Sequence, residues 1–173
     1  AARLGSDVPF FLNGPSSVCE SRGEIVRPIG PPVVCQWVLL MLPAISMPTP
    51  AVYQRFDAMP EHSSAPGLVP VRWDEAVDWS QWRTLDAEEL LRVLRNDLEP
   101  PAFDLVPELN SLRASAERIA ARPVRMSGSG STLFTLFDTK NEASRIAGEI
   151  QSRLSLRTLV VPIAPEVTVA PDA

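Results

Sequence analysis

Hydrophobic and polar positions along the chain follow two kinds of pattern, one that predicts strands and one that predicts helices. Short apolar runs bounded by Gly, Pro or Asn are typical of strands, whereas apolar residues spaced three and four apart are typical of helices. The strands are expected at residues 16–19, 24–29, 36–42, 123–126, 132–137 and 156–163. The helices are expected from Thr49 to about Phe56, from Asp86 to about Asn96, from Pro107 through Ile119, and from Thr139 through Leu154.

The order of these elements predicts the fold class. From residue 36 onward the order is strand, helices, a hairpin, a helix and a strand, which indicates an α+β fold. We expect a mostly antiparallel sheet covered by helices on one face. A domain boundary is expected at Gly30-Pro31-Pro32, because proline cannot donate to a sheet ladder. The expected division is residues 1–32, residues 33–164 and a loose tail at 165–173.

Composition narrows the classes of function. The chain has 173 residues and a net charge of -5 without a basic run, which argues against a nucleic-acid partner. No apolar run approaches the ~20 residues of a membrane helix, and no signal peptide is recognised. Cys19 and Cys35 fit neither a disulfide framework nor a metal motif, so reduced thiols in a cytoplasmic protein are expected. The one histidine, His62, offers little material for a metal site.

The first candidate for chemistry is Asp7. It lies between Gly5 and Pro9 in an irregular turn that precedes an apolar stretch. An aspartate held in this way can orient a substrate hydroxyl or accept its proton. Asp also caps turns and helices, and the spacing alone does not separate the two roles.

The second candidate is the turn from Ser127 to Ser131. Its glycines permit positive φ and a close approach of the backbone, so that successive N–H groups can bind an anion. The alternative is a hairpin turn that binds nothing. The turn is not a Walker loop, because no Lys follows it, and it joins two strands, unlike a Rossmann fingerprint.

Three further patterns have both a functional and a structural interpretation. Thr49 and Tyr53 lie four residues apart on one helix face, where they can contact a planar base or serve as a cap and a core residue. The Asn-Asp-Leu-Glu segment at residues 96–99 is a helix end or a site loop. The tryptophans of the irregular stretch 59–84 pin that stretch to the domain or form a ligand platform.

The order of the motifs is more specific than any one of them. The sequence Leu-Gly-Ser-Asp-Val-Pro-Phe-Phe is followed by Gly23-Glu24 and by Pro-Thr-Pro with an aromatic one turn later. Asn-Asp-Leu-Glu and Met-Ser-Gly-Ser-Gly-Ser-Thr-Leu-Phe come next. In this order they resemble the C-terminal half or more of the 4-diphosphocytidyl-2-C-methyl-D-erythritol kinases, a family of the GHMP superfamily. The resemblance covers roughly residues 1–163 and departs from the family at Ser21, where Gly is usual.

The resemblance implies a fold, a reaction and a site. It implies a GHMP-kinase C-terminal domain, ferredoxin-like, in a cytoplasmic enzyme of the non-mevalonate isoprenoid pathway. It implies phosphorylation of the 2-hydroxyl of 4-diphosphocytidyl-2-C-methyl-D-erythritol by ATP and Mg²⁺, with no metal ligand assigned in this chain. The residues that it implies are Asp7 as catalytic, Thr49 and Tyr53 at the cytidine, and Ser127, Gly128, Ser129, Gly130 and Ser131 near the phosphates and substrate.

The resemblance also implies that part of the family's machinery lies elsewhere. The family's N-terminal lysine, its Tyr-His pair and its glycine-rich ATP loop have no counterpart here, and the chain does not begin with Met. We therefore expect a C-terminal portion, with residues 1–32 as a remnant of the N-terminal domain, that is inactive alone. The alternatives are another GHMP small-molecule kinase, such as a homoserine or mevalonate-pathway kinase, and a non-catalytic α+β module. No oligomeric state is indicated.

Overall fold

The structure, a computed structural model, describes residues 10, 16–20, 23, 25–35, 37–59 and 78–163. The strands are β1 (Ser17–Glu20), β2 (Ile25–Pro28), β3 (Trp37–Leu42), β4 (Arg125–Met126), β5 (Leu133–Phe137) and β6 (Arg157–Pro162). The helices are α2 (Thr49–Asp57), α3 (Trp79–Trp82), α4 (Ala87–Val93), α5 (Glu99–Leu105), α6 (Pro107–Ala120) and α7 (Lys140–Leu154). None of the helices in these ranges is both long and apolar enough to cross a membrane.

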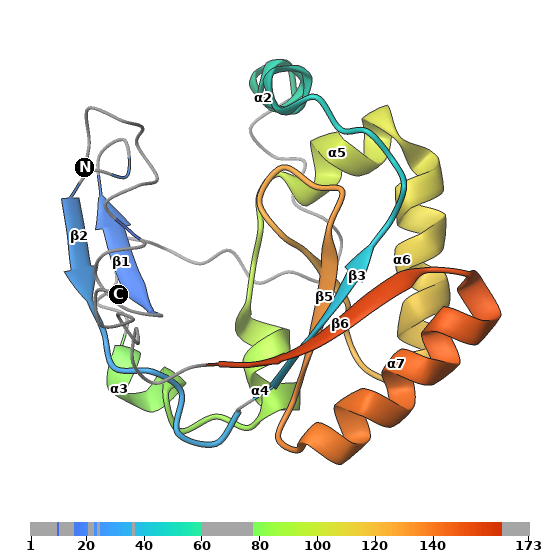
Figure 1. Ribbon diagram of the computed structural model, residues 1–173. Coiled ribbons are helices and arrows are strands. Elements are labelled where there is room, and N and C mark those ends of the chain that lie inside the picture. Colours follow the sequence, from blue (N-terminus) through green and yellow to red (C-terminus); the bar gives the residue numbers. More distant parts are fainter. Residues whose placement is uncertain are drawn as a thin grey trace, which may run out of the picture.

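The strands form two separate antiparallel sheets. One has four strands in the order β4-β5-β3-β6, and the other is the β1–β2 pair (Figure 1). In the larger sheet β3 is central, so that Leu39 lies opposite Thr135 on one side and Val160 on the other. The α+β class and the antiparallel sheet expected from the sequence are confirmed.

Helices cover both faces of the four-stranded sheet, and the expectation of one covered face is wrong. Leu39 and Met41 of β3 belong to the main core, which α6 and α7 close on one face. The neighbouring side chain Val38 faces the other way, into a second cluster beneath α4. β5 repeats the pattern, with Leu136 in the second cluster. Because both central strands are apolar on both faces, each face needs a cover.

The helix boundaries follow the capping residues of the sequence. Asp86 accepts a hydrogen bond from the Glu89 N–H, and Glu89 bonds back to the Asp86 N–H, so that a capping box starts α4. The Thr139 side chain caps α7 by accepting the Glu142 N–H, without a reciprocal bond from Glu142. α4 ends at Val93, earlier than the expected Asn96. The Asn-Asp-Leu-Glu segment therefore follows α4 and is not part of it.

Helix α5 was not expected from the sequence. Pro100 and Pro101 look like a break, but they lie in the first turn of α5, where a backbone N–H has no helical partner. α5 packs beside α2, and the Arg55 Nε donates to Asp104 across 2.6 Å. The pair of helices lies above the end of the sheet that carries the β4–β5 loop (Figure 1).

The segment around Gly30 is tied to the end of α3. The Val33 N–H donates to the carbonyl of Arg83 at 2.9 Å, and the Arg83 Nε donates to the carbonyl of Pro31 at 2.9 Å. In α3 the rings of Trp79 and Trp82 meet edge to face, 5.3 Å apart. Trp82 also packs on the second cluster, so this part of the Trp-rich stretch contacts the domain. The predicted division at residues 30–32 stays a prediction, and Trp73 and His62 lie outside the described residues.

Candidate functional site

The loop from Ser127 to Ser131 connects β4 to β5 and is closed by its own backbone. The Ser127 N–H donates to the carbonyl of Thr132 at 2.9 Å, and the Gly130 N–H donates to the carbonyl of Ser127 at 3.0 Å. Gly128 and Gly130 have φ of 55° and 89°, the left-handed region that side chains disfavour. A Cβ at Gly130 would lie 2.8 Å from the Met126 sulfur, so a side chain at this position would also force the Met126 side chain to move.

Three other backbone donors of the loop have no partner among the residues that the structure describes. In the described residues, no acceptor bonds the N–H groups of Gly128, Ser129 and Ser131. Ser127 and Gly128 are exposed, so one side of the loop is open to solvent. A turn with several free N–H groups and a positive-φ glycine has the chemistry of an anion site. The Gly130 N–H is turned inward and is not one of these donors.

The side chain of Asn96 holds the carbonyl side of the loop. Its Nδ2 donates to the carbonyl oxygens of Met126 at 3.0 Å and Gly128 at 2.7 Å. Its Oδ1 accepts the N–H of Leu98 at 3.0 Å. Asn96 lies in the connection between α4 and α5, about 30 residues before the loop. This connection therefore acts as a brace, beyond its role as a helix end.

Glu99 holds the strand that leads into the loop. Its Oε1 accepts the N–H of Met126 at 2.7 Å, and its other oxygen lies 3.5 Å from the guanidinium of Arg125. The side chain is buried, and this burial raises the pKa of Glu99 above its ordinary value. The bond from Met126 and the charge of Arg125 oppose the rise in pKa. A buried carboxylate at this point fixes β4 to the start of α5.

Helix α2 contacts the opposite side of the loop. The Thr49 Oγ1 and the Ser129 Oγ are 2.8 Å apart, and the Ser131 Oγ donates to the carbonyl of Ile45 at 2.6 Å. The sequence alternative of Thr49 as a cap is wrong, because Pro48 holds the N-cap position and Thr49 is the first helical residue. The hydroxyl of Thr49 is thus available to the loop.

Tyr53 lies one helical turn beyond Thr49 with 52% of its surface exposed. The alternative of a core tyrosine is therefore wrong. An exposed ring close to a hydroxyl that contacts the loop is suited to stacking against a planar group.

The structure brings together the motifs that it describes, and one predicted residue falls outside it. Thr49, the Asn-Asp-Leu-Glu segment and the serine–glycine loop meet, although up to 80 residues separate them. Asp7 lies outside the described residues. The roles of Asn96 and Glu99 were missed, because side-chain bonds to a distant backbone leave no mark in periodicity. Within the described ranges no group of three or more His, Cys, Asp or Glu residues is arranged to hold a metal.

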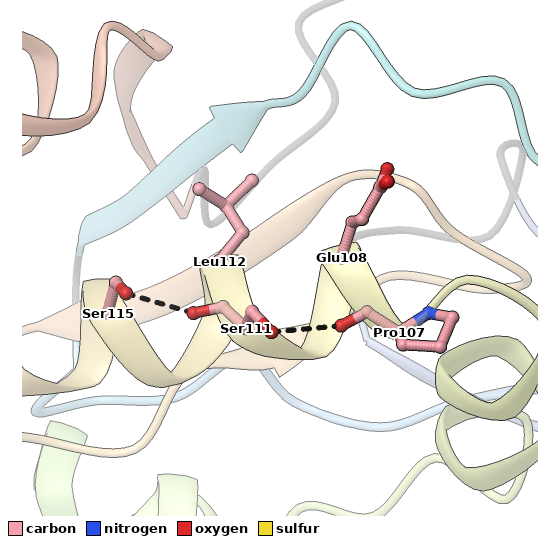
Figure 2. Close-up of a pocket in the computed structure, with 5 residues that line it drawn as sticks. All are labelled: Pro107, Glu108, Ser111, Leu112 and Ser115. Carbon is pink, nitrogen blue, oxygen red and sulfur yellow. Dashed lines mark hydrogen bonds between the residues drawn. The ribbon is translucent and has the colours of Figure 1, made fainter.

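A hollow along α6 offers fewer groups for binding than the β4–β5 loop. Figure 2 shows its lining by Pro107, Glu108, Ser111, Leu112 and Ser115. The two serine hydroxyls donate to carbonyls of their own helix, Ser111 to Pro107 at 3.2 Å and Ser115 to Ser111 at 2.9 Å. Because the hydroxyls are used by the helix itself, the loop between β4 and β5 is the better candidate site.

Comparison with known sequences points to one group of enzymes. Residues 81–156 match the family described as GHMP kinases C terminal. The chain is 40% identical over 151 residues to the 4-diphosphocytidyl-2-C-methyl-D-erythritol kinase of Cereibacter sphaeroides (strain KD131 / KCTC 12085), covering 85% of this chain and 49% of that protein. It is 31% identical over 164 residues to the kinase of the same name from Dehalococcoides mccartyi (strain CBDB1), covering 95% and 55%. The chain thus spans about half the length of the curated relatives it matches.

Comparison with solved structures agrees with the sequence matches. A crystal structure of 4-(cytidine 5'-diphospho)-2C-methyl-D-erythritol kinase superposes with a TM-score of 0.65 at 29% identity, over 92% of this chain and 53% of that one. A homoserine kinase from Cytophaga hutchinsonii superposes with a TM-score of 0.55 at 16% identity, over 90% and 49%. The second likeness is one of fold alone, and it shows that the architecture hosts more than one kinase.

Proposed function

We propose that this chain, which belongs to the GHMP kinases, is part of an enzyme that phosphorylates 4-diphosphocytidyl-2-C-methyl-D-erythritol. The phosphoryl group would go from ATP to the 2-hydroxyl, in the non-mevalonate route to isoprenoid precursors. The observation that carries the proposal is the convergence of α2 and the Asn-Asp-Leu-Glu segment on one loop with free N–H groups. The curated relatives of this name support it at 30–40% identity. A cytoplasmic setting fits the two free cysteines.

The loop is suited to bind phosphate oxygens of the nucleotide or the substrate. ATP, when bound with Mg²⁺, supplies the phosphoryl group, and little covalent chemistry is left to the protein. The N–H groups of Gly128, Ser129 and Ser131 can donate to anionic oxygens that gain charge during transfer. No ligand for Mg²⁺ is assigned among the described residues.

Two residues carry roles by the family resemblance. Asp7 would orient the accepting hydroxyl or receive its proton, which places it among the catalytic residues. Tyr53 would stack on the cytosine ring, beside the hydroxyl of Thr49, and its 52% exposure leaves the ring free to do so. Each stacked base is worth ~1–3 kcal/mol, which would favour a substrate that carries a base over one that lacks it.

The test uses the complete kinase, assayed with 4-diphosphocytidyl-2-C-methyl-D-erythritol and, separately, with homoserine. We expect turnover of the first substrate only. The Asp7→Asn variant should lose ~100-fold or more in kcat and keep its affinity for the cytidine substrate.

A second pair of variants tests the cytosine contact. Tyr53→Ala should raise KM for the cytidine substrate by roughly 5- to 150-fold and leave KM for ATP unchanged, whereas Tyr53→Phe should behave like the parent. Phosphorylation of homoserine, or equal losses for both ligands in Tyr53→Ala, would contradict the proposal.

A further inference from the structure

The peptide unit between Gly128 and Ser129 is held from one side only. In a trans peptide the C=O and the following N–H point in opposite directions, so that fixing one fixes the other. Asn96 Nδ2 lies 2.7 Å from the Gly128 oxygen, and no other described side chain bonds that oxygen. The direction of the Ser129 N–H, which has no partner in the described residues, therefore follows from the Asn96 amide.

We infer that Asn96 is a positioning residue that aims the Ser129 N–H at a phosphate oxygen of the bound nucleotide or substrate. This inference rests on the proposed function. Asn96 reaches the loop from the α4–α5 connection and does not belong to the hairpin itself. Its bonds to the carbonyls of Met126 and Gly128 and its bond from the Leu98 N–H lock the amide in one orientation. Such an arrangement sets a donor before the ligand arrives.

The local chemistry explains why an asparagine is needed at this position. Aspartate has the same shape but has no N–H donors, and its charge would face two carbonyl oxygens. Alanine removes the donors without adding a charge. In either variant the Gly128 peptide gains freedom, because a Cβ at Gly128 would meet nothing within 4 Å and glycine tolerates many conformations. The loop would stay attached through the Thr49–Ser129 contact. The expected defect is therefore a wrong direction of the Ser129 N–H.

The test replaces Asn96 in the complete kinase by Asp and, separately, by Ala. We expect kcat to fall about 100-fold, the effect of misplacing a positioned group by about 1 Å. KM for the cytidine substrate should stay unchanged, because Tyr53 and Thr49 are untouched. The matched control is Asn141→Asp, the same change on the exposed first turn of α7, which should keep the parent kcat.

A spectroscopic measurement separates positioning from a structural role. In the parent kinase the Ser129 amide resonance should shift on addition of ATP and its cytidine substrate, and in both Asn96 variants this shift should be lost. Three results would overturn the inference. They are a parent-like kcat in Asn96→Ala, a ligand-induced Ser129 shift in the Asn96 variants equal to that of the parent, and failure of both variants to fold. If the parent binds ATP but does not phosphorylate the cytidine substrate, the proposed reaction fails. The Ser129 shift then still decides the role of Asn96.

Discussion

Two hairpins of this chain have similar turns and different surroundings. The β1–β2 turn contains Gly23 at a φ of 96°, and the β4–β5 loop contains Gly130 at a φ of 89°. Both pairs are antiparallel. The β1–β2 hairpin has an ion pair of its own between Glu20 and Arg27, at 3.0 Å and largely exposed. The β4–β5 loop is instead held by side chains and carbonyls from three other segments.

The difference shows what turns a glycine turn into a candidate site. Glycine supplies the positive φ in both hairpins, and so it does not distinguish them. The distinguishing feature is that distant segments bond a carbonyl and two hydroxyls of the β4–β5 loop, while the N–H groups of Gly128, Ser129 and Ser131 have no partner among the described residues. A serine–glycine sequence is therefore informative only together with the residues that brace it.

The largest expected contrast is in hydrogen exchange. Amides of β5 should exchange only on global unfolding, because β5 lies inside the four-stranded sheet with Leu133 and Phe137 fully buried. Amides of β2 should exchange at least ~1000-fold faster, since a two-stranded pair with Ile25 47% exposed has little to stabilise it. Similar amide protection of β2 and β5, measured by mass spectrometry, would contradict the difference between the two hairpins.

A smaller contrast is expected from alanine at the turn glycines. Gly130→Ala should lower the free energy of unfolding by about 3 kcal/mol, because positive φ and overlap with Met126 both oppose a Cβ. Gly128→Ala meets no neighbour and should cost about 1 kcal/mol.

The matched variant in the other hairpin is Gly23→Ala. It has a comparable φ and should leave the main unfolding transition unchanged, because among the described strands β1 and β2 pair only with each other. Calorimetry on the three variants measures the difference. Equal effects of Gly23→Ala and Gly130→Ala would mean that both hairpins unfold with the core.

The smallest contrast is in pairwise coupling. A double-mutant cycle of Thr49→Val with Ser129→Ala should give a coupling of ~1 kcal/mol, as for a hydrogen bond between two ordered segments. The equivalent cycle of Glu20→Ala with Arg27→Ala should give ~0.2 kcal/mol, since exposed ion pairs contribute little. Denaturant unfolding of the parent and of the three variants in each cycle is the measurement. A larger coupling in the Glu20–Arg27 cycle would reverse the ranking of the two hairpins.

Much of the fold was predictable because residues within or next to each helix and strand indicate where it begins. Asp86 at the start of α4, Pro107 at the start of α6 and the apolar run of β3 each placed an element to within a few residues. Helix α5 was missed because Pro100 and Pro101 are compatible with a break and with a first turn.

The candidate site was predictable in its parts and not in its connections. The loop and Thr49 were identified from residue type, but the 2.8 Å contact between Thr49 and Ser129 depends on how α2 folds over the sheet. The brace by Asn96 is of the same kind, a side chain that bonds backbone 30 and 32 residues away. Periodicity describes neighbours in sequence and cannot describe such bonds. The role of Asp7 stays a prediction.

The Arg83 contact has a consequence for anyone who wishes to use the four-stranded region as a portable scaffold. A Cβ at Gly30 would lie 2.2 Å from the guanidinium carbon of Arg83, so the arginine lies flat against bare backbone. Excision at the predicted boundary, at residue 33, would delete the Pro31 carbonyl that receives its Nε. The half-buried guanidinium would then lose its acceptor. A transplantable unit should therefore keep Gly30 and Pro31 as its leading residues.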